Sequence, residues 1–404
     1  MKMQIVILKL VVFVSLPFFV YMCSENPIKT DLNHSSLEID TLTIHSMNAF
    51  NYSVAPNLGT NERLYLGSKN GLDIDLSLIE IEDVSSWNFF YDTSLVIDSL
   101  HFLLYSDDSL LDYNEVPNLY FSPDSQFNEN NSTYLDFENF SNSNWYNLGS
   151  PLIKIKHTDD TSGVFQYTEL LWSIDTLLQA LSDTVDSNLV RTFAIQFSDN
   201  NSSFLELFSE EATTGETDPK INMYYRTTTD SLDSTLSRTI FSNGDLSIII
   251  PNSIPIDSNS IELSNGMGLR SILDIPIEEN FILSGSLIRS ANLIIPYDTT
   301  FSNTDYNVIL DPIQSDSLVL DDAMVYEEDP YIAMGFPYRV SADSQNGDCI
   351  LSVKDIIQNI NLGNVRNLGF KIISNEKNDP FASIRFYVDE TWSNSRLEII
   401  YVKN

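Results

Sequence analysis

The chain contains very little cysteine, only Cys23 and Cys349 among 404 residues, and this excludes a disulfide framework. Domains of about 150–200 residues bury enough core to fold without such cross-links. The low count is therefore compatible with export to an oxidising compartment. A catalytic thiol needs a basic partner, and the four histidines show no cysteine-protease pattern. Cys349 is expected to pack as a small hydrophobic residue.

Positive charge is also scarce, because 21 Lys and Arg residues face 57 Asp and Glu residues and the formal net charge is −36. Such a surface repels phosphate backbones and anionic lipid headgroups. No run of Lys and Arg offsets this charge locally. The sequence thus predicts no nucleic-acid partner, and membrane contact only through an N-terminal lipid.

Sequence motifs of common enzymes are absent. The chain has no Gly-x-Ser-x-Gly, no His-Glu-x-x-His, no P-loop and no dinucleotide-binding pattern. With so many carboxylates, a glycosidase site cannot be argued from their number, because paired geometry defines that site. We therefore predict that the protein is not an enzyme and needs no cofactor. A hydrolase or lyase with a divergent site is the weakest of the alternatives.

Calcium ligands require a separate argument, since three acidic segments offer oxygen donors: Asp257, Asp321 with Asp322, and Asp343 to Asp348. None of these segments matches an EF-hand loop. Asp, Asn and Ser are also the ordinary residues of turns. Turn formation is the favoured interpretation, and structural calcium stays open beside it.

The N-terminal segment has the pattern of an export signal. Lys2 precedes an apolar run that Lys9 interrupts and that contains Pro17, so it fits a signal peptide better than a membrane span. The run ends at Cys23, and the segment around this cysteine resembles the lipobox of bacterial lipoproteins, although Tyr21 and Met22 are unusual there. We predict a signal peptide over 1–22, lipidation of Cys23 and a polar tether over 23–36. The protein is then exported and lipid-anchored at the outer membrane or cell surface.

Two distant parts of the chain run through similar segments in the same order, which indicates an internal repeat. In each copy a strand, a glycine turn and a second strand come first, followed by a hydrophobic strand, a short amphipathic helix and three further strands. The first features of the copies are 64–71 and 261–268, and the hydrophobic strands are 98–105 and 289–297. The predicted helices are 171–181 and 350–360, each with a serine, Ser173 or Ser352, at a favourable N-cap position.

A polar segment rich in Thr, Ser and Asp separates the two copies and places a domain boundary near residue 232. The expected fold class is all-β, with two tandem antiparallel β-sandwich modules of jelly-roll type over 37–232 and 233–404, each with one short helix. The aperiodic stretches 106–149 and 299–348 are expected to be loop excursions.

This series of segments resembles the DNRLRE-domain family, jelly-roll modules of bacterial exported proteins that are related to carbohydrate-binding modules. The resemblance rests on Ala55-Pro-Asn-Leu-Gly59 before Leu64-Tyr-Leu-Gly67, and on the strands 98–105 and 290–295. An arginine that is typical of the family is matched by Arg270 in the second copy, whereas the first copy has Asp73 in the comparable stretch. The resemblance implies a jelly-roll fold and glycan binding, with no fixed ligand residues.

Sugar recognition needs an exposed aromatic face beside polar side chains, and two clusters supply one: Trp87 with Tyr91, and Trp145 with Tyr146. Aromatic residues also fill the cores of β-sandwiches, so packing is the favoured alternative for both clusters. The predicted function is a non-catalytic surface lipoprotein that binds extracellular glycan or polysaccharide. The alternative is a structural or adhesive cell-envelope protein that contacts protein partners.

Overall fold

A computed structural model describes the chain from residue 38 to residue 403, except for several internal segments. The segments not described are 82–91, 108–115, 124–125, 138–140, 161–162, 182–190, 198–202, 213–216, 229–234, 252–259, 279–280, 283–285, 302–304, 315–324 and 389–393. The predicted signal peptide and tether therefore lie outside the described residues.

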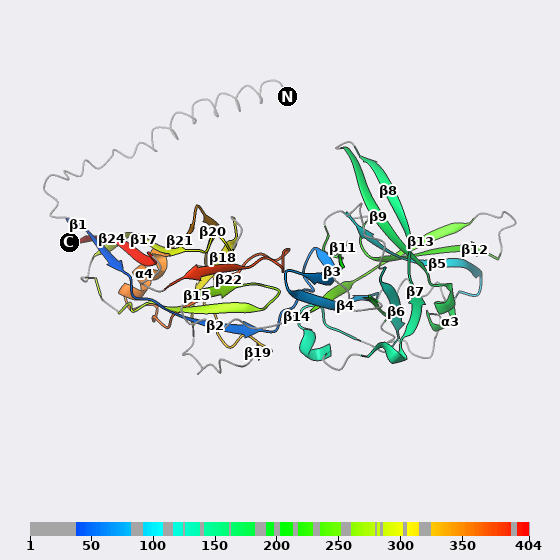
Figure 1. Ribbon diagram of the computed structural model, residues 1–404, viewed down its shortest axis with the longest axis horizontal. Coiled ribbons are helices and arrows are strands. Elements are labelled where there is room, and N and C mark those ends of the chain that lie inside the picture. The colour runs from blue at the N-terminus through cyan, green and yellow to red at the C-terminus, as the bar shows by residue number, and fades with distance from the viewer. Residues whose placement is uncertain are drawn as a thin grey trace, which may run out of the picture.

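The described part of the chain is all-β, as the sequence predicts, and its strands form two groups that lie end to end (Figure 1). We call the first group the inner unit, because its strands are contiguous in sequence. Its strands are β3 (Arg63–Lys69), β4 (Leu72–Glu80), β5 (Leu95–Ser106), β6 (Asn118–Ser122), β7 (Tyr146–Gly149), β8 (Leu152–Asp160), β9 (Gly163–Ser173), β10 (Thr192–Gln196), β11 (Phe204–Phe208), β12 (Lys220–Thr227), β13 (Leu236–Phe241) and β14 (Gly244–Pro251).

The second group, the outer unit, combines two strands from the start of the described chain with ten from its end. Its strands are β1 (Glu38–Ile44), β2 (Asn48–Val54), β15 (Ser260–Leu263), β16 (Leu269–Asp274), β17 (Leu287–Pro296), β18 (Asn307–Pro312), β19 (Val325–Tyr326), β20 (Val340–Gln345), β21 (Asp348–Ser352), β22 (Phe370–Ser374), β23 (Ile384–Tyr387) and β24 (Arg396–Lys403).

The two units share one pattern of strand pairing. In the inner unit one sheet runs β13-β12-β5-β9-β8, and the other contains β6, β10, β4 and β14 as successive neighbours. In the outer unit β1-β24-β17-β21-β20 corresponds to the first sheet, and β18-β22-β16-β2 corresponds to the second. The pairs β11 with β3 and β23 with β15 also correspond. The weak repeat in the sequence thus accompanies a shared topology.

Strand pairing crosses the predicted boundary at residue 232, because the two leading strands of each sequence copy are exchanged between the units. β1 pairs with β24 and β2 pairs with β16, both in the outer unit. In return β13 pairs with β12 and β14 pairs with β4, both in the inner unit. Figure 1 shows the blue strand β1 beside β24, at the end of the molecule away from β3 and β4. The packed units therefore differ from the contiguous segments 37–232 and 233–404.

A hydrophobic core lies inside each unit, and the exchanged strands contribute to both cores. Along β24, buried Leu397 and Ile399 alternate with polar Arg396 and Glu398, so one face of the strand is apolar. Met47 and Ala49, which flank the start of β2, pack in this outer core. In the inner core the largest buried side chains include Trp172, Phe102 and Phe193, and β13 adds Ile240.

Each unit contains one short helical segment near its predicted place: η4 (Asp175–Leu177) with α3 (Leu178–Leu181), and α4 (Lys354–Asn361). Both helices begin later than the sequence pattern indicates. The first residues of each predicted helix belong to strands, because Trp172 pairs with Phe102 and Leu351 pairs with Leu293. Ile174 and Val353 occupy the N-cap positions without a side-chain cap, so the prediction of serine caps is wrong.

The predicted loop excursions also contain regular structure. The first holds β6, η2 (Tyr134–Phe137), η3 (Asn142–Asn144) and β7, and the second holds β18, β19 and β20. Short, irregularly spaced strands leave no period in the sequence, and their sheet partners decide their conformation. No helix among the described residues is both long and apolar enough to cross a membrane.

The two units meet through a cluster of apolar side chains. Phe381 of the outer unit packs with Leu58, Tyr65 and Ile249, and its ring centroid lies 5.1 Å from that of Tyr65. The Tyr65 hydroxyl donates a hydrogen bond to the carbonyl of Asn378 at 2.9 Å. The junction thus combines apolar burial with a polar contact from one unit to the other.

Candidate functional site

The aromatic residues predicted from the sequence lie in different surroundings. Trp87 and Tyr91 lie outside the described residues, as does Cys23. Trp145 is half-buried and packs on an apolar sheet face that includes Leu78 and Ala194. Tyr146 on β7 is 53% exposed. Trp145 therefore has a packing partner within the protein, and Tyr146 keeps a face open to solvent.

Of the other predicted features, two agree with the structure. Cys349 is fully buried in the outer core, and burial raises the pKa of its thiol to about 12, so it is inert. The acidic segment from Asp343 forms the β20–β21 hairpin, in which Asn346 and Gly347 both have positive φ as a two-residue turn requires. Asp257, Asp321 and Asp322 lie outside the described residues.

A cleft of about 440 Å³ lies where the chain passes from the outer to the inner unit. Its walls come from the segments 56–61, 264–270 and 373–377, together with Ile309 and Arg339. The first segment connects β2 of the outer unit to β3 of the inner unit, so the pairing of β2 with β16 brings this wall to the outer unit.

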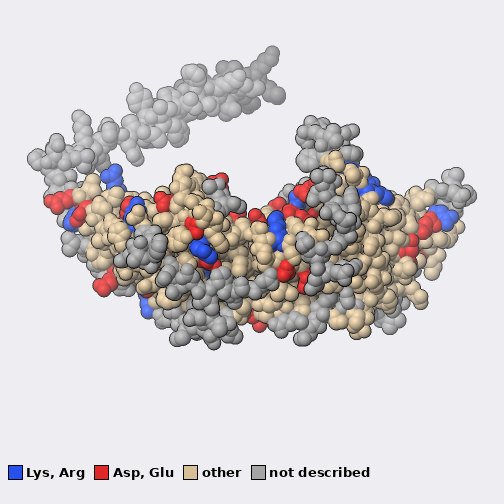
Figure 2. Space-filling view, viewed as in Figure 1, with Lys and Arg blue, Asp and Glu red and all other residues tan. Residues whose placement is uncertain are grey.

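The described lining of this cleft contains no Asp or Glu, although acidic residues outnumber basic residues in the whole chain. On the face drawn in Figure 2, acidic residues lie over both units with basic residues among them. The bases of the cleft are Arg270, Arg339 and Lys377. The first two are ion-paired to Asp329 and Asp311, whereas Lys377 has no ion pair within the described part of the chain. The cleft is therefore locally suited to an anionic or neutral polar ligand.

Amide side chains supply most of the remaining polar groups of the cleft. Asn265 donates from Nδ2 to the carbonyl of Glu376 at 2.7 Å, and Asn375 donates to Oδ1 of Asn307 at 2.7 Å. These bonds fix the two side chains and use only their amide N–H groups. The side-chain oxygens of Asn265 and Asn375 can therefore still accept hydrogen bonds from a ligand. A ligand with hydroxyl groups would find acceptors beside the ammonium group of Lys377.

A shallower hollow lies on the outer face of β5 and β12 in the inner unit. It is lined by His101 and Tyr224, whose ring centroids are 5.5 Å apart, and by Asp98 and Arg226, which form an ion pair at 2.7 Å. An aromatic pair beside charged groups has the composition that stacking on a sugar requires. No sequence pattern marks this hollow, because His101 and Tyr224 lie far apart in the chain.

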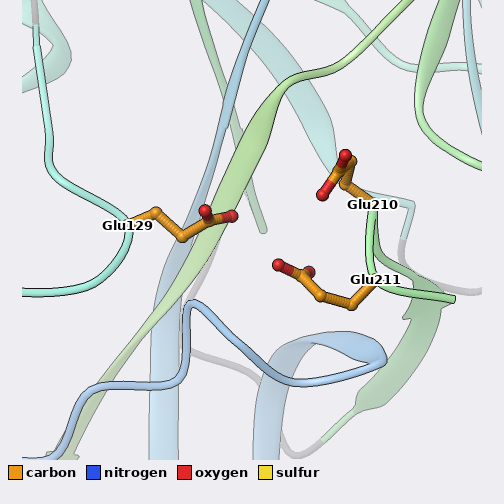
Figure 3. Close-up of side chains that lie close together, drawn as sticks. All are labelled: Glu129, Glu210 and Glu211. Carbon is orange, nitrogen blue, oxygen red and sulfur yellow. The ribbon is translucent and has the colours of Figure 1, made fainter.

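The inner unit also holds a cluster of carboxylates that the sequence analysis missed. Glu129, from the loop between β6 and η2, faces Glu210 and Glu211, from the turn after β11 (Figure 3). One carboxylate oxygen from each of the three residues lies within 4.8 Å of the other two. Glu129 precedes the adjacent residues Glu210 and Glu211 by about 80 positions in the chain. Only the pair of neighbouring glutamates is visible as a pattern in the sequence.

A fourth carboxylate lies behind these three. Asp245, near the start of β14, is 1% exposed. Its Oδ2 accepts a hydrogen bond from the backbone N–H of Glu210 at 2.7 Å, and its own backbone N–H donates to Oε1 of Glu129 at 3.0 Å. Its second oxygen, Oδ1, is buried and has no hydrogen-bond partner.

The electrostatics of the cluster follow from burial and like charge. Burial raises the pKa of Glu211 to about 7, and the charge of Glu129 adds to this effect. Burial also raises the pKa of Glu210 and raises that of Asp245 strongly, with further contributions from the neighbouring carboxylates. Among the described residues, no Lys or Arg forms a salt bridge with any of the four.

Comparison with known proteins gives no relative from which a function could be transferred. No protein-family model matches the chain, and no curated protein or solved structure shows significant similarity to it.

Proposed function

We propose that this chain is a non-catalytic, exported binding protein that recognises an extracellular glycan at the cleft between its two units. The observation that supports this proposal most is the composition of the cleft: amides, hydroxyls and bases from three segments, without a carboxylate in its described lining. Hydroxyl-rich ligands pair with amide and hydroxyl groups, and a glycan that carries carboxylates would also meet Lys377. An acidic polysaccharide is the ligand that fits best.

Two sequence features add support. The resemblance to DNRLRE modules implies carbohydrate binding, and the N-terminal pattern with Cys23 implies export and a lipid anchor. In the proposal the two units form the binding head, and the lipid on Cys23 holds it at the outer membrane or cell surface.

The binding experiment uses the soluble fragment 37–404 and gel retardation on a panel of acidic and neutral polysaccharides. We expect retention on at least one acidic polysaccharide and a loss of about tenfold in affinity for Lys377→Gln, since a charge-assisted hydrogen bond contributes about 1.5–3 kcal/mol. Lys377 forms no ion pair in the described part of the chain, so the fold should tolerate this change.

Lys354→Gln is the matched control, because Lys354 lies exposed on α4, outside the cleft lining, and its loss should leave retention unchanged. Tyr224→Ala alters the shallow hollow on β5 and β12 and leaves the cleft unchanged, so it shows which of the two surfaces binds the glycan. Retention that is sensitive to Tyr224→Ala and not to Lys377→Gln would assign the glycan to that hollow. No retention on any polysaccharide would contradict the proposal.

The alternative, a structural or adhesive envelope protein, is favoured by a different observation. β8 lies at the end of its sheet, in a hairpin with β9 that projects from the inner unit (Figure 1). Its Leu152 and Ile155 are 64% and 49% exposed. Sheet edges with apolar side chains can receive a strand from a partner protein. A folded fragment that binds no polysaccharide would favour this function.

A further inference from the structure

The four carboxylates of the inner unit form a concentration of negative charge that the described protein does not balance. Only other acids contribute charge effects to the pKa of Glu210, Glu211 and Asp245. Ionised carboxylates that leave water without a counter-charge cost several kcal/mol each in a protein interior. A group that supplies positive charge at this place would remove that cost.

The unpaired oxygen of Asp245 is an independent sign of a missing partner. Buried polar atoms in proteins are nearly always hydrogen-bonded, and each exception needs an explanation. Oδ1 belongs to a carboxylate whose other oxygen is bonded to Glu210, and the adjacent backbone N–H is bonded to Glu129. This buried oxygen therefore belongs to a residue that is bonded directly to two members of the Glu129, Glu210 and Glu211 cluster.

We propose that Glu129, Glu210 and Glu211, with Asp245 beside them, form a site for one calcium ion. All donors of the cluster are carboxylate oxygens, and it contains no histidine or cysteine, which favours a hard cation over zinc or copper. Magnesium keeps several of its waters and is usually bound through one or two carboxylates, whereas calcium takes six to eight oxygen ligands. Three carboxylates from the protein therefore favour calcium.

The loop that carries Glu129 is held rigidly, so this ligand is positioned before an ion arrives. Nδ2 of Asn57 donates to the carbonyls of both Glu129 and Ser132, at 2.8 and 2.7 Å. Gly59 lies so close that a Cβ atom on it would be 2.1 Å from the carbonyl oxygen of Glu129. Rigid ligands lose little entropy on binding, which raises the affinity for the ion.

This inference goes beyond glycan binding, and calcium binding can be tested without a glycan. The purified chain is freed of metal with a chelator and titrated with CaCl₂ at neutral pH in an isothermal calorimeter, in 0.15 M salt that screens diffuse binding to the acidic surface. We expect one site per chain, at least tenfold tighter for Ca²⁺ than for Mg²⁺. Saturating Ca²⁺ should raise Tm by roughly 3–6 °C.

Glu211→Gln and Glu129→Gln remove one ligand charge each and should weaken Ca²⁺ binding at least tenfold. Without Ca²⁺ both variants should have a Tm equal to or above that of the unaltered chain, because each relieves repulsion in the cluster. This result would show that lost binding is not lost folding. Glu278→Gln is the matched control, since Glu278 is exposed and lies outside the cluster.

Three outcomes would overturn the inference. The first is the absence of a Ca²⁺-dependent rise in Tm in the unaltered chain. The second is an equal Ca²⁺ affinity in Glu211→Gln and Glu278→Gln, which would show diffuse binding to the acidic surface. The third is an equal affinity for Mg²⁺ and Ca²⁺, which would contradict the selection of the larger ion. Glycan retention is not measured, so failure here would leave the proposed function standing.

Discussion

Asp329 shows how the outer unit neutralises a partly buried charge. Its carboxylate forms ion pairs with Arg270 and Lys371 and accepts hydrogen bonds from the hydroxyl of Tyr52 and the backbone N–H of Tyr331. Burial by itself would raise the pKa of Asp329, but Arg270 and Lys371 together outweigh burial and hold the pKa below its ordinary value. The ionised form is therefore the stable one.

Replacing Asp329 by Asn should lower the free energy of unfolding by about 2–3 kcal/mol at pH 7, because Lys371 and Arg270 lose their counter-charge. The pKa of Asp329 is lower in the folded than in the unfolded chain, so its contribution is present above about pH 4 and is lost as the pH falls through the folded pKa. Urea unfolding of both chains between pH 3 and pH 7 measures the difference.

The difference between the two chains should shrink toward pH 3. Asp274→Asn provides the control, because Asp274 is exposed at the end of β16 and its replacement should change stability little at any pH. A difference for Asp329→Asn that stays constant from pH 3 to pH 7 would contradict the ion-pair explanation.

At the scale of elements, the exchanged strands determine which strands depend on one another. β1 pairs with β24 and β2 with β16 in the outer unit. β13 pairs with β12 and β14 with β4, the corresponding strands of the inner unit. Each exchanged strand satisfies backbone groups of its partner that would otherwise be left without hydrogen bonds at a sheet edge.

Deleting residues 37–55 should therefore destabilise the outer unit, which lies far along the chain, and leave the inner unit folded. Hydrogen exchange read by mass spectrometry should show lost protection in β16 and β24, with protection retained in β4 and β12. If β1 and β2 packed instead on the sequence copy that follows them, β4 and β12 would lose protection. That result would refute the exchange.

For the whole molecule, the junction between the units decides whether they unfold together. Phe381 is 4% exposed, and its ring centroid lies 5.0 Å from that of Phe204 and 5.1 Å from that of Tyr65. The ammonium group of Lys69 lies 5.0 Å from the centroid of the same ring. One side chain of the outer unit thus fills an apolar pocket of the inner unit.

Phe381→Ala should cost about 3 kcal/mol of stability, because it leaves a cavity at the junction. In differential scanning calorimetry we expect the unaltered chain to unfold in one transition and the variant in two, since the units lose their coupling. Phe50→Ala is the control, because Phe50 is 53% exposed on β2. Identical single transitions in both variants would show that Phe381 does not couple the units.

The sequence by itself determined the class of fold and the repeated order of strands and helix, because apolar periodicity is a local property of the chain. It also determined the burial of Cys349 and the position of the polar segment between the copies. It placed the helices too early, since Trp172 and Leu351 satisfy a helical period although their backbones pair with neighbouring strands.

Only the tertiary structure decided which leading strands pack on which unit, because the pairing of β1 with β24 and of β2 with β16 joins residues more than 200 positions apart. The candidate sites depend on the same long-range choices. The cleft needs residues 56–61 beside residues 264–270, and the carboxylate cluster needs Glu129 beside Glu210 and Asp245. No local pattern in an acidic chain marks such a meeting point, because repulsion between distant carboxylates arises only when folding brings them together.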